Sequence, residues 1–183
     1  MTFVFEVAKV VIISLAIIIP VRYFLIQPFY VKGASMEPSF YDHEYLIIDE
    51  ITYRFREPQR GEIVVFKYPR DPSQYFIKRV IALPGEKIEI QNGEVFIYTK
   101  DTNRKIKLDE GYLFENIDTI ANTDTPIEVG EDQYYVLGDN RNHSKDSRNF
   151  GAVKSSFVIG RVVFRGWPFS RLGTFELPDY SLF

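Results

Sequence analysis

Residues 75–82 read Tyr-Phe-Ile-Lys-Arg-Val-Ile-Ala, and this stretch decides the fold that we expect. Side chains of a β-strand point alternately to opposite faces of the sheet. Lys78 therefore shares one face with Phe76 and Val80, and the opposite face is also mainly apolar. A strand that is apolar on both faces is typical of the inside of a domain, so we expect a buried strand that carries a lysine.

Short β-type runs continue on both sides of this strand, separated by Gly, Pro, Asn and Asp. Such runs, with no dominant helical period, indicate an all-β domain. Asn92-Gly93 is the strongest hairpin signal, because both central positions of a type I′ turn need a positive φ. The strands that we expect are 45–49, 62–67, 75–82, 86–90, 94–98, 134–137 and 157–164.

The chain of 183 residues, 45% hydrophobic and 26% charged, is long enough for one main core and a small subdomain. Its sequence becomes more polar and irregular from residue 93 to residue 131. We interpret 93–131 as a small β-rich inserted cap. Residues 28–92 and 132–183 would then form the catalytic β core.

Residues 3–26 are almost wholly apolar. A helix of this length would span a hydrocarbon core of about 30 Å, at a rise of about 1.5 Å per residue. We therefore predict an N-terminal anchor over 1–27 that contains one transmembrane helix. The alternative is a cleavable signal peptide, but the chain has no basic segment before the apolar run and no Ala-x-Ala-like site after it. The few basic residues leave the orientation of the helix open.

Charge and cysteine content limit the classes of function. The formal net charge is -3 and no long Lys/Arg run occurs, which argues against a nucleic-acid partner. Peptides and membrane lipid fit better. The absence of cysteine removes thiol nucleophiles, disulfides and cysteine-bound zinc. The oligomeric state stays open.

The candidate nucleophile lies in 31–39, which reads Val-Lys-Gly-Ala-Ser-Met-Glu-Pro-Ser. Ser35 follows a glycine in an expected turn, and a serine hydroxyl needs a base and an oxyanion donor. Burial of Lys78 would disfavour its charged form, which lowers the pKa until the neutral amine can accept a proton. The alternative is that Lys78 reaches solvent or pairs with a carboxylate.

A Ser-His-Asp triad would need His43 or His143, since the chain has no other histidine. His143 lies in 138–148, a loop rich in turn residues. This loop does not fit a calcium site, because Arg141 and His143 stand where oxygen ligands are required. With no His-Glu-x-x-His and no clustered histidines, we expect neither a metal nor another cofactor.

Three residues of the same loop could support a reacting lysine. The Ser144 hydroxyl can donate to a neighbouring amine, and Asp146 and Arg148 can form an ion pair that braces the loop. Such a group is also typical of a solvated loop.

Taken together, these stretches resemble type I bacterial signal peptidases, which are membrane-bound Ser/Lys endopeptidases that remove signal peptides from exported preproteins. The similarity runs in the family's order from the anchor to Arg148. The matching stretches are the anchor, Gly-Ala-Ser35-Met36-Glu-Pro38, Arg60-Gly-Glu-Ile-Val-Val-Phe66, Phe76-Ile-Lys78-Arg79-Val-Ile-Ala-Leu-Pro-Gly85 and Gly138-Asp-Asn-Arg-Asn-His-Ser-Lys-Asp146-Ser-Arg148.

The resemblance implies that Ser35 is the nucleophile and Lys78 the general base of a serine endopeptidase. Ser144 matches a serine that helps to orient the lysine amine. The resemblance also implies the Ser/Lys signal-peptidase fold, with a catalytic domain on the outer face of the cytoplasmic membrane. It further implies preprotein substrates that are cut at Ala-x-Ala-like sites.

Four more positions carry roles by resemblance. Asp146 and Arg148 match a structural ion pair near the site, and Met36 matches a packing residue beside the nucleophile. Gly33 stands where some relatives have a serine whose hydroxyl adds a donor to the oxyanion hole. The short single-anchor branch of the family commonly has glycine at this position. The resemblance thus leaves the Ser35 N–H as the identified donor.

Two rival hypotheses remain. One is a self-cleaving, repressor-type Ser/Lys peptidase, which the spanning anchor and the lack of DNA-binding helices argue against. The other is a membrane-tethered binding module without activity.

Aromatic residues in three segments could form an apolar surface that dips into lipid, namely 28–30, 40–41 and 167–169. For Trp167 we favour core packing, because large aromatic side chains are mostly buried.

Overall fold

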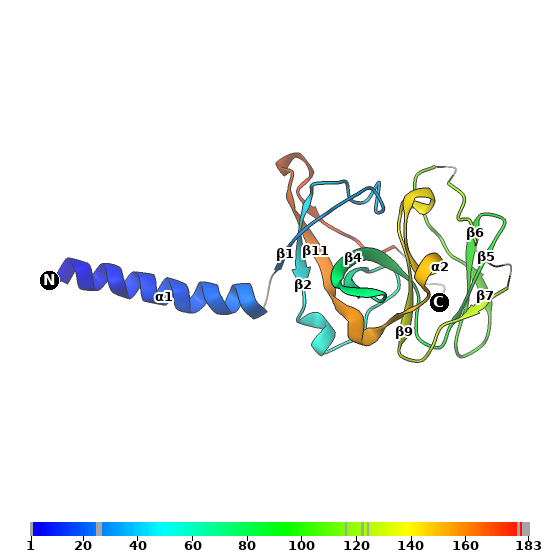
Figure 1. Ribbon diagram of the computed structural model, residues 1–183, viewed down its shortest axis with the longest axis horizontal. Helices are drawn as coiled ribbons and strands as arrows, with labels where there is room; N and C mark the ends of the chain where they lie inside the picture. The colour runs from blue at the N-terminus through cyan, green and yellow to red at the C-terminus, as the bar shows by residue number, and fades with distance from the viewer. Residues whose placement is uncertain are drawn as a thin grey trace.

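The computed structural model describes residues 2–24, 27–115, 117–121, 123, 125–178 and 180. Two antiparallel sheets form the body, and helix α1 (Thr2–Phe24) extends away from it (Figure 1). The predicted mostly β architecture is therefore confirmed.

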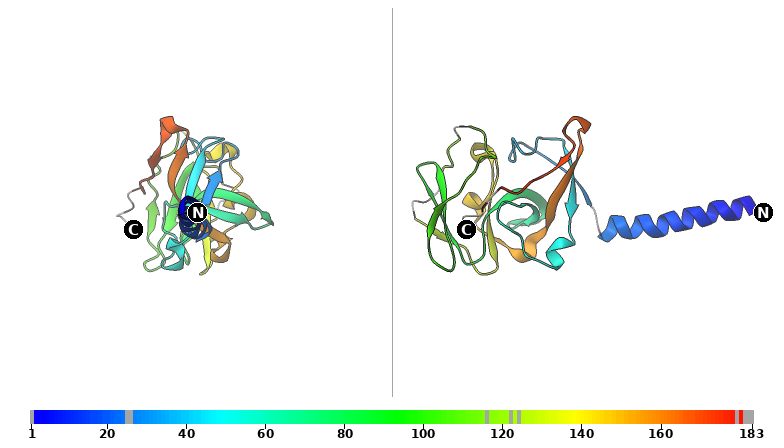
Figure 2. Two further views of the ribbon diagram at one scale, coloured as in Figure 1. Left: turned by 90° about the vertical axis from the view of Figure 1, so that its left-hand side faces the viewer. Right: turned by 180° about the vertical axis from the view of Figure 1, so that it is seen from behind.

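Helix α1 exposes large apolar side chains along its described length, such as Phe3 at 77% and Ile12 at 66% exposure. It leaves the body on one side and makes no layer with the sheets (Figure 2). Across the described part of the chain, no helix has the length and apolar character needed to cross a membrane. The predicted transmembrane helix is thus not confirmed, and residues 1, 25 and 26 of the predicted anchor lie outside the described residues.

The larger sheet has the strand order β1-β2-β11-β3-β4-β9-β10, and β12 pairs with β11. Strand β4 lies between β3 and β9, and its second half is buried, as the apolar pattern of 75–82 predicts. It begins four residues earlier than expected, because the polar, exposed start gives no apolar signal. The strands are β1 (Gln27–Tyr30), β2 (Tyr45–Asp49), β3 (Ile63–Tyr68), β4 (Asp71–Ala82), β9 (Gln133–Leu137), β10 (Val153–Lys154), β11 (Val158–Trp167) and β12 (Gly173–Thr174).

The smaller sheet has the order β7-β6-β5-β8 and occupies the end of the body away from α1 (Figure 1). Asn92 and Gly93 have φ values of 52° and 83°, so the predicted turn joins the first two strands of this sheet. The predicted boundary between residues 92 and 93 falls inside that hairpin, and the division into core and cap stays a prediction. The strands are β5 (Lys87–Gln91), β6 (Glu94–Tyr98), β7 (Lys105–Lys107) and β8 (Ile127–Glu128).

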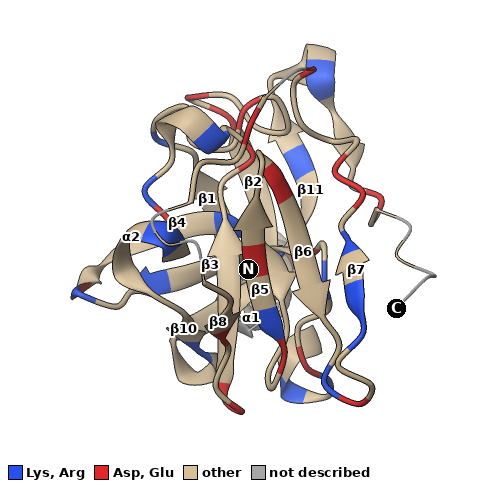
Figure 3. Ribbon diagram, turned by 90° about the vertical axis from the view of Figure 1, so that its right-hand side faces the viewer, with Lys and Arg blue, Asp and Glu red and all other residues tan. Residues whose placement is uncertain are grey.

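Charged side chains cover this smaller sheet. Lys105 of β7 lies 2.7 Å from Glu89 of β5, and Lys107 lies 2.5 Å from Glu94 of β6. Figure 3 shows basic and acidic positions on neighbouring strands of this face. Its polar surface explains why the sequence of this part of the chain is less regular than that of the larger sheet.

Within the described residues, five short helices connect the strands. They are η1 (Thr52–Arg54), η2 (Arg141–His143), α2 (Ser147–Phe150), η3 (Ser155–Phe157) and η4 (Phe169–Arg171). Each is too short to show a helical period in the sequence.

The exposure of the aromatic side chains differs from what we expected. Phe40 is fully buried, whereas Trp167 is 46% and Phe169 71% exposed. The preference for a buried Trp167 is therefore wrong. Trp167 ends β11, beyond the part of the strand that packs in the core, and its ring lies against that of Phe169 at 4.7 Å.

Candidate active site

Ser35 lies in a turn after β1, and the residue that follows it, Met36, is fixed in the core. Met36 is 1% exposed and packs in one apolar cluster with Val31 and Phe40. Gly33 has a φ of +85°, and its N–H donates to Asp42 Oδ1 at 2.9 Å. The left-handed backbone at Gly33 turns the chain, and the buried Met36 holds the following residue in place.

The loop 138–148 lies directly against this turn. Asn140 donates its backbone N–H to Ser35 O at 3.1 Å and its side-chain Nδ2 to Ala34 O at 3.1 Å. A Cβ atom at Gly138 would overlap Ser35 O and Ser144 Oγ. The loop can approach the serine this closely only because position 138 has no side chain.

Lys78 reaches the same serine from β4. Its Nζ lies 2.7 Å from Ser35 Oγ and donates to Ile77 O, also at 2.7 Å. The side chain is almost completely buried, with the residue 3% exposed. Burial lowers the pKa of Lys78 to about 8, although the charges of Asp146 and Asp139 act in the opposite direction.

Asp146 and Arg148 form an ion pair below the lysine, with 2.8 Å between Oδ2 and Nη2. The Asp146 carboxylate also accepts the N–H of Gly138 at 3.1 Å and caps α2. Burial alone would raise the pKa of Asp146, but the hydrogen bonds and charge of Arg148 hold it below its ordinary value. The pair therefore fixes an ionised carboxylate within the loop that contacts Ser35.

Ser144 lies in this loop with its hydroxyl buried. Within the described residues, its Oγ has no hydrogen bond to the Lys78 amine, whose contacts are Ser35 and Ile77. It lies close to Asp146 and helps to lower the pKa of that carboxyl group. The structure thus brings Ser144 to the site without placing it on the lysine.

A second buried ion pair was not predicted. Arg79, next to Lys78, bonds Asp139 through Nε at 2.9 Å and Nη2 at 2.6 Å, and Ser39 Oγ donates to Asp139 at 2.6 Å. The partners are 60 residues apart, so their spacing gives no signal. A buried arginine in an apolar strand does require a carboxylate, and that requirement was the available clue.

Arg141 joins the loop to the segment between β7 and β8. Its fully buried guanidinium donates to Glu110 Oε2 at 3.0 Å, to Thr119 Oγ1 at 2.5 Å and to Gly138 O at 3.0 Å. From the sequence, Arg141 was considered only because it stands where a calcium site would need an oxygen ligand, and its structural role was not predicted. Its place next to Gly138 connects the polar insertion with the turn that carries Ser35.

Ser35 and Lys78 open into a groove of about 650 Å³. One wall comes from Phe29 to Ser35, and the other comes from Gln74 to Lys78 of β4. His143 lies at the rim, but the hydrogen bond that Ser35 Oγ makes within the described residues is to Lys78. Among those residues, no group of three or more His, Cys, Asp or Glu could hold a metal ion.

Comparisons with known proteins point to one family. The chain matches the signal peptidase family, peptidase S26, over residues 4–167. It is 38% identical to a probable signal peptidase I-2 of Synechocystis sp., over 92% of this chain and 75% of that protein. It is 31% identical to a signal peptidase I of Bacillus amyloliquefaciens, over 90% and 89% of the two chains.

A crystal structure of a signal peptidase I from Enterococcus faecalis aligns with a TM-score of 0.45 and 32% identity, covering 58% of this chain and 97% of that chain. A signal peptidase IB of Staphylococcus aureus is 35% identical over 86% of each chain. Because the family match covers most of the sequence, the chain belongs to the signal peptidase family, peptidase S26.

Proposed function

We propose that this signal peptidase I, a serine endopeptidase, uses Ser35 and Lys78 as its catalytic dyad. The observation that carries the proposal is the 2.7 Å contact between Lys78 Nζ and Ser35 Oγ. The lowered pKa of Lys78 supports it, because an amine with a pKa of about 8 is partly neutral near physiological pH.

The reaction then has two halves. Neutral Lys78 removes the proton of Ser35 Oγ, which attacks the scissile carbonyl, and the protonated lysine returns that proton to the leaving amine. The signal peptide is left as an ester on Ser35. Lys78 next takes a proton from water, the hydroxide attacks the ester, and the proton returns to Ser35 as the acid product leaves.

The oxyanion of each step needs a donor. The Ser35 N–H is suited to this role, because it donates no hydrogen bond within the described residues. Gly33 brings no side-chain donor, and a Cβ atom there would meet nothing within 4 Å. We therefore assign the Ser35 amide as the donor that stabilises the tetrahedral intermediate.

The other site residues act as supports. Asp146 and Arg148 hold the loop whose Asn140 bonds the backbone of Ser35. Met36 fixes the turn from the core side, and Ser144 lies beside Asp146 in the same loop. None of these residues needs to touch the substrate for this role.

The substrate binds as an extended segment in the groove. Strand β9 pairs with β4 only from Arg79 to Ala82, whereas β3 pairs along the other edge back to Asp71. The edge of β4 before Lys78 is thus open within the described structure and can accept a further strand. Ala-x-Ala-like sites fit this arrangement, since side chains two apart in a strand face the same wall.

We place the protein at the cytoplasmic membrane, held there by α1 as a single pass, with its catalytic domain on the extracytoplasmic side. The apolar exposure of α1 supports this location. The face of the body from which α1 leaves also carries η1 and the turn between β11 and η4 (Figures 1 and 2). That turn presents the exposed rings of Trp167 and Phe169.

Cleavage of a test preprotein in detergent by the full chain, with the cut mapped by mass spectrometry, tests the proposed function. We expect one cut after a small-x-small sequence. The chain incubated alone should stay intact, because self-scission without preprotein cleavage would favour the repressor-type peptidase. Binding of the preprotein without any cleavage would favour the inert binding module.

The dyad also predicts the pH dependence of the reaction. Only neutral Lys78 can accept a proton, so kcat/KM should fall about tenfold for each pH unit below a pKa of about 8 and level off above it. Rates from pH 5 to pH 10 on one peptide substrate measure this. A kcat/KM that does not change with pH over this range would contradict the assignment of Lys78 as the base.

The exposed rings predict a membrane contact. Trp167→Ser combined with Phe169→Ser should weaken the binding of the full chain to liposomes, because both rings are exposed and neither replacement empties the core. Co-sedimentation compares this variant with Phe114→Ser, whose 43% exposed ring lies in the segment between β7 and β8. Equal binding by both variants would show that the turn does not contact lipid.

A further inference from the structure

The groove around the dyad is lined by positive charge. Lys32 and Lys145 line it together with Lys78, and His143 lies at its rim. Among the described residues, no aspartate or glutamate lines it. A concave site lined by one sign of charge favours ligands of the other sign.

The ammonium group of Lys145 has a defined place on this wall. Its Nζ lies 4.6 Å from the centre of the Tyr68 ring, and that ring stacks on Phe76 at 4.5 Å. Phe76 itself lines the groove and lies 5.6 Å from Lys78 Nζ. Lys145 is therefore held at the groove by its contact with an aromatic ring.

No carboxylate neutralises this lysine within the described residues, since Lys145 forms none of their ion pairs. Two acidic residues that follow or contact groove-lining residues have other partners. Asp146 is paired with Arg148, and Asp42 accepts the N–H of Gly33. Lys145 is exposed, so its charge is available to a bound peptide.

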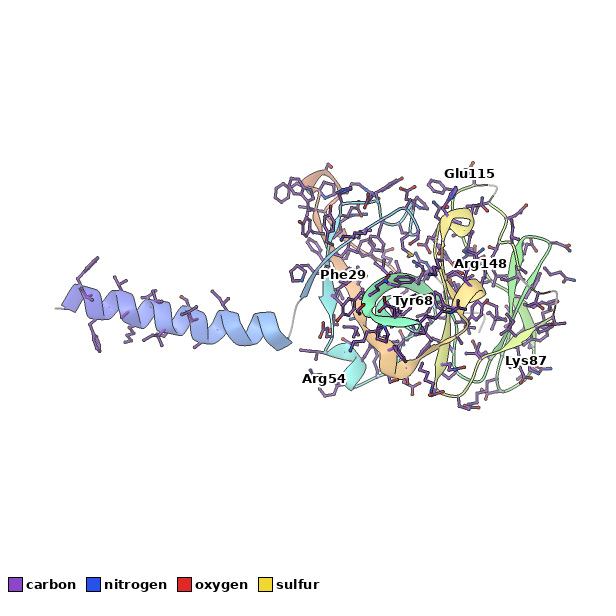
Figure 4. The ribbon with its side chains drawn as sticks, viewed as in Figure 1. Phe29, Arg54, Tyr68, Lys87, Glu115 and Arg148 are labelled. Atoms are coloured by element: carbon purple, nitrogen blue, oxygen red, sulfur yellow. The ribbon has the colours of Figure 1, made fainter. Side chains whose placement is uncertain are left out.

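The position of Lys145 along the groove indicates which part of a substrate it meets. Phe29 comes from β1, which starts three residues after α1 ends, and its ring contacts Tyr75 across the groove at 6.3 Å. Figure 4 shows Phe29 on the side of the body that α1 leaves. A signal peptide that arrives from that side places its upstream residues at this end.

Phe76, which stacks on the Tyr68 ring that Lys145 contacts, is two residues before Lys78 on β4, or about 7 Å along a strand. The substrate side chain next to Lys145 is therefore about two residues upstream of the scissile bond. In an Ala-x-Ala-like site this is the middle residue, and the residue two positions earlier lies on the same face.

We propose that Lys145, assisted by Lys32, selects preproteins with an acidic side chain at the middle residue of the cleavage site or two positions before it. The inference rests on the proposed function and names the substrate class of that same groove. A carboxylate at these positions can pair with an ammonium group that has no carboxylate partner within the described residues, whereas a substrate lysine would be repelled.

Three peptides that differ only in Glu, Gln or Lys at the middle residue test this with the full chain. We expect kcat/KM to be about threefold to tenfold higher for Glu than for Gln, and lower for Lys than for Gln. Sodium chloride at about 0.5 M should reduce this preference, since salt screens partly exposed charges.

Variants at position 145 separate charge from structure. Lys145→Gln should bring the Glu-to-Gln ratio close to one, Lys145→Arg should keep it, and Lys145→Glu should favour the Lys peptide. Lys154→Gln, at an exposed lysine outside the groove, should leave the ratio unchanged.

The Gln peptide serves as the reference for each enzyme. If the parent chain cleaves it and shows no preference for Glu, the charge proposal fails while the proposed function stands. Retention of the full preference in Lys145→Gln would also overturn the proposal. If the parent chain cleaves none of the peptides, both fail.

Discussion

Replacement of Ser35 by alanine is expected to lower kcat/KM on a preprotein by at least about 1,000-fold, and Lys78→Met should do the same. The first change removes the attacking oxygen, and the second removes the amine that lies 2.7 Å from it. Methionine keeps most of the volume of the buried lysine, so the core around β4 stays filled. The two residues act as a unit, and the double variant should be no slower than either single one.

Single-turnover cleavage of one preprotein, together with thermal unfolding of each variant, measures this. Ser155→Ala and Lys154→Ala are matched controls, because both residues are exposed and outside the groove. Substantial cleavage by folded Lys78→Met would refute the assignment of Lys78 as the base.

Gly138→Ala should lower kcat/KM by about 100-fold, although no reacting group is removed. The new Cβ atom would overlap Ser35 O and Ser144 Oγ, so either the turn that carries Ser35 or the loop that carries Ser144 must move. A displacement of about 1 Å at a reacting group can cost about 100-fold in rate.

Gly173→Ala is the matched control, because a Cβ atom at Gly173 would meet nothing within 4 Å. Comparing kcat/KM with the melting temperature separates misplacement of Ser35 from general unfolding. A Gly138→Ala protein with the parent's activity would show that the loop does not fix the position of the serine.

Most of the longer strands of both sheets could be predicted from the sequence, because the alternation of apolar and polar residues and the apolar runs indicate burial. Strands β2 and β6 have the predicted bounds, 45–49 and 94–98, and the Asn92-Gly93 turn joins β5 to β6. Strands of two to four residues, such as β1 and β12, were not predicted. They are too short to show a period in the sequence.

The buried polar contacts could not be predicted. Arg79 meets Asp139, 60 residues away, and Arg141 meets Glu110 across 31 residues. A charge buried at either place is costly unless it is paired, and sequence spacing does not show which carboxylate arrives there. Trp167 shows that residue type can also mislead. Tryptophan is usually buried, but its place at the end of β11 exposes this one.

The sequence by itself determined the mostly β class and the residue types of a Ser/Lys site, because both depend on local patterns and on chemistry that few side chains can supply. The tertiary structure alone decided that β4 carries Lys78 to within 2.7 Å of Ser35 and that Gly138 lies against the serine's backbone. It also placed Lys145 on the groove wall. These distances depend on how strands from separate parts of the chain pack, and packing is a property of the whole fold.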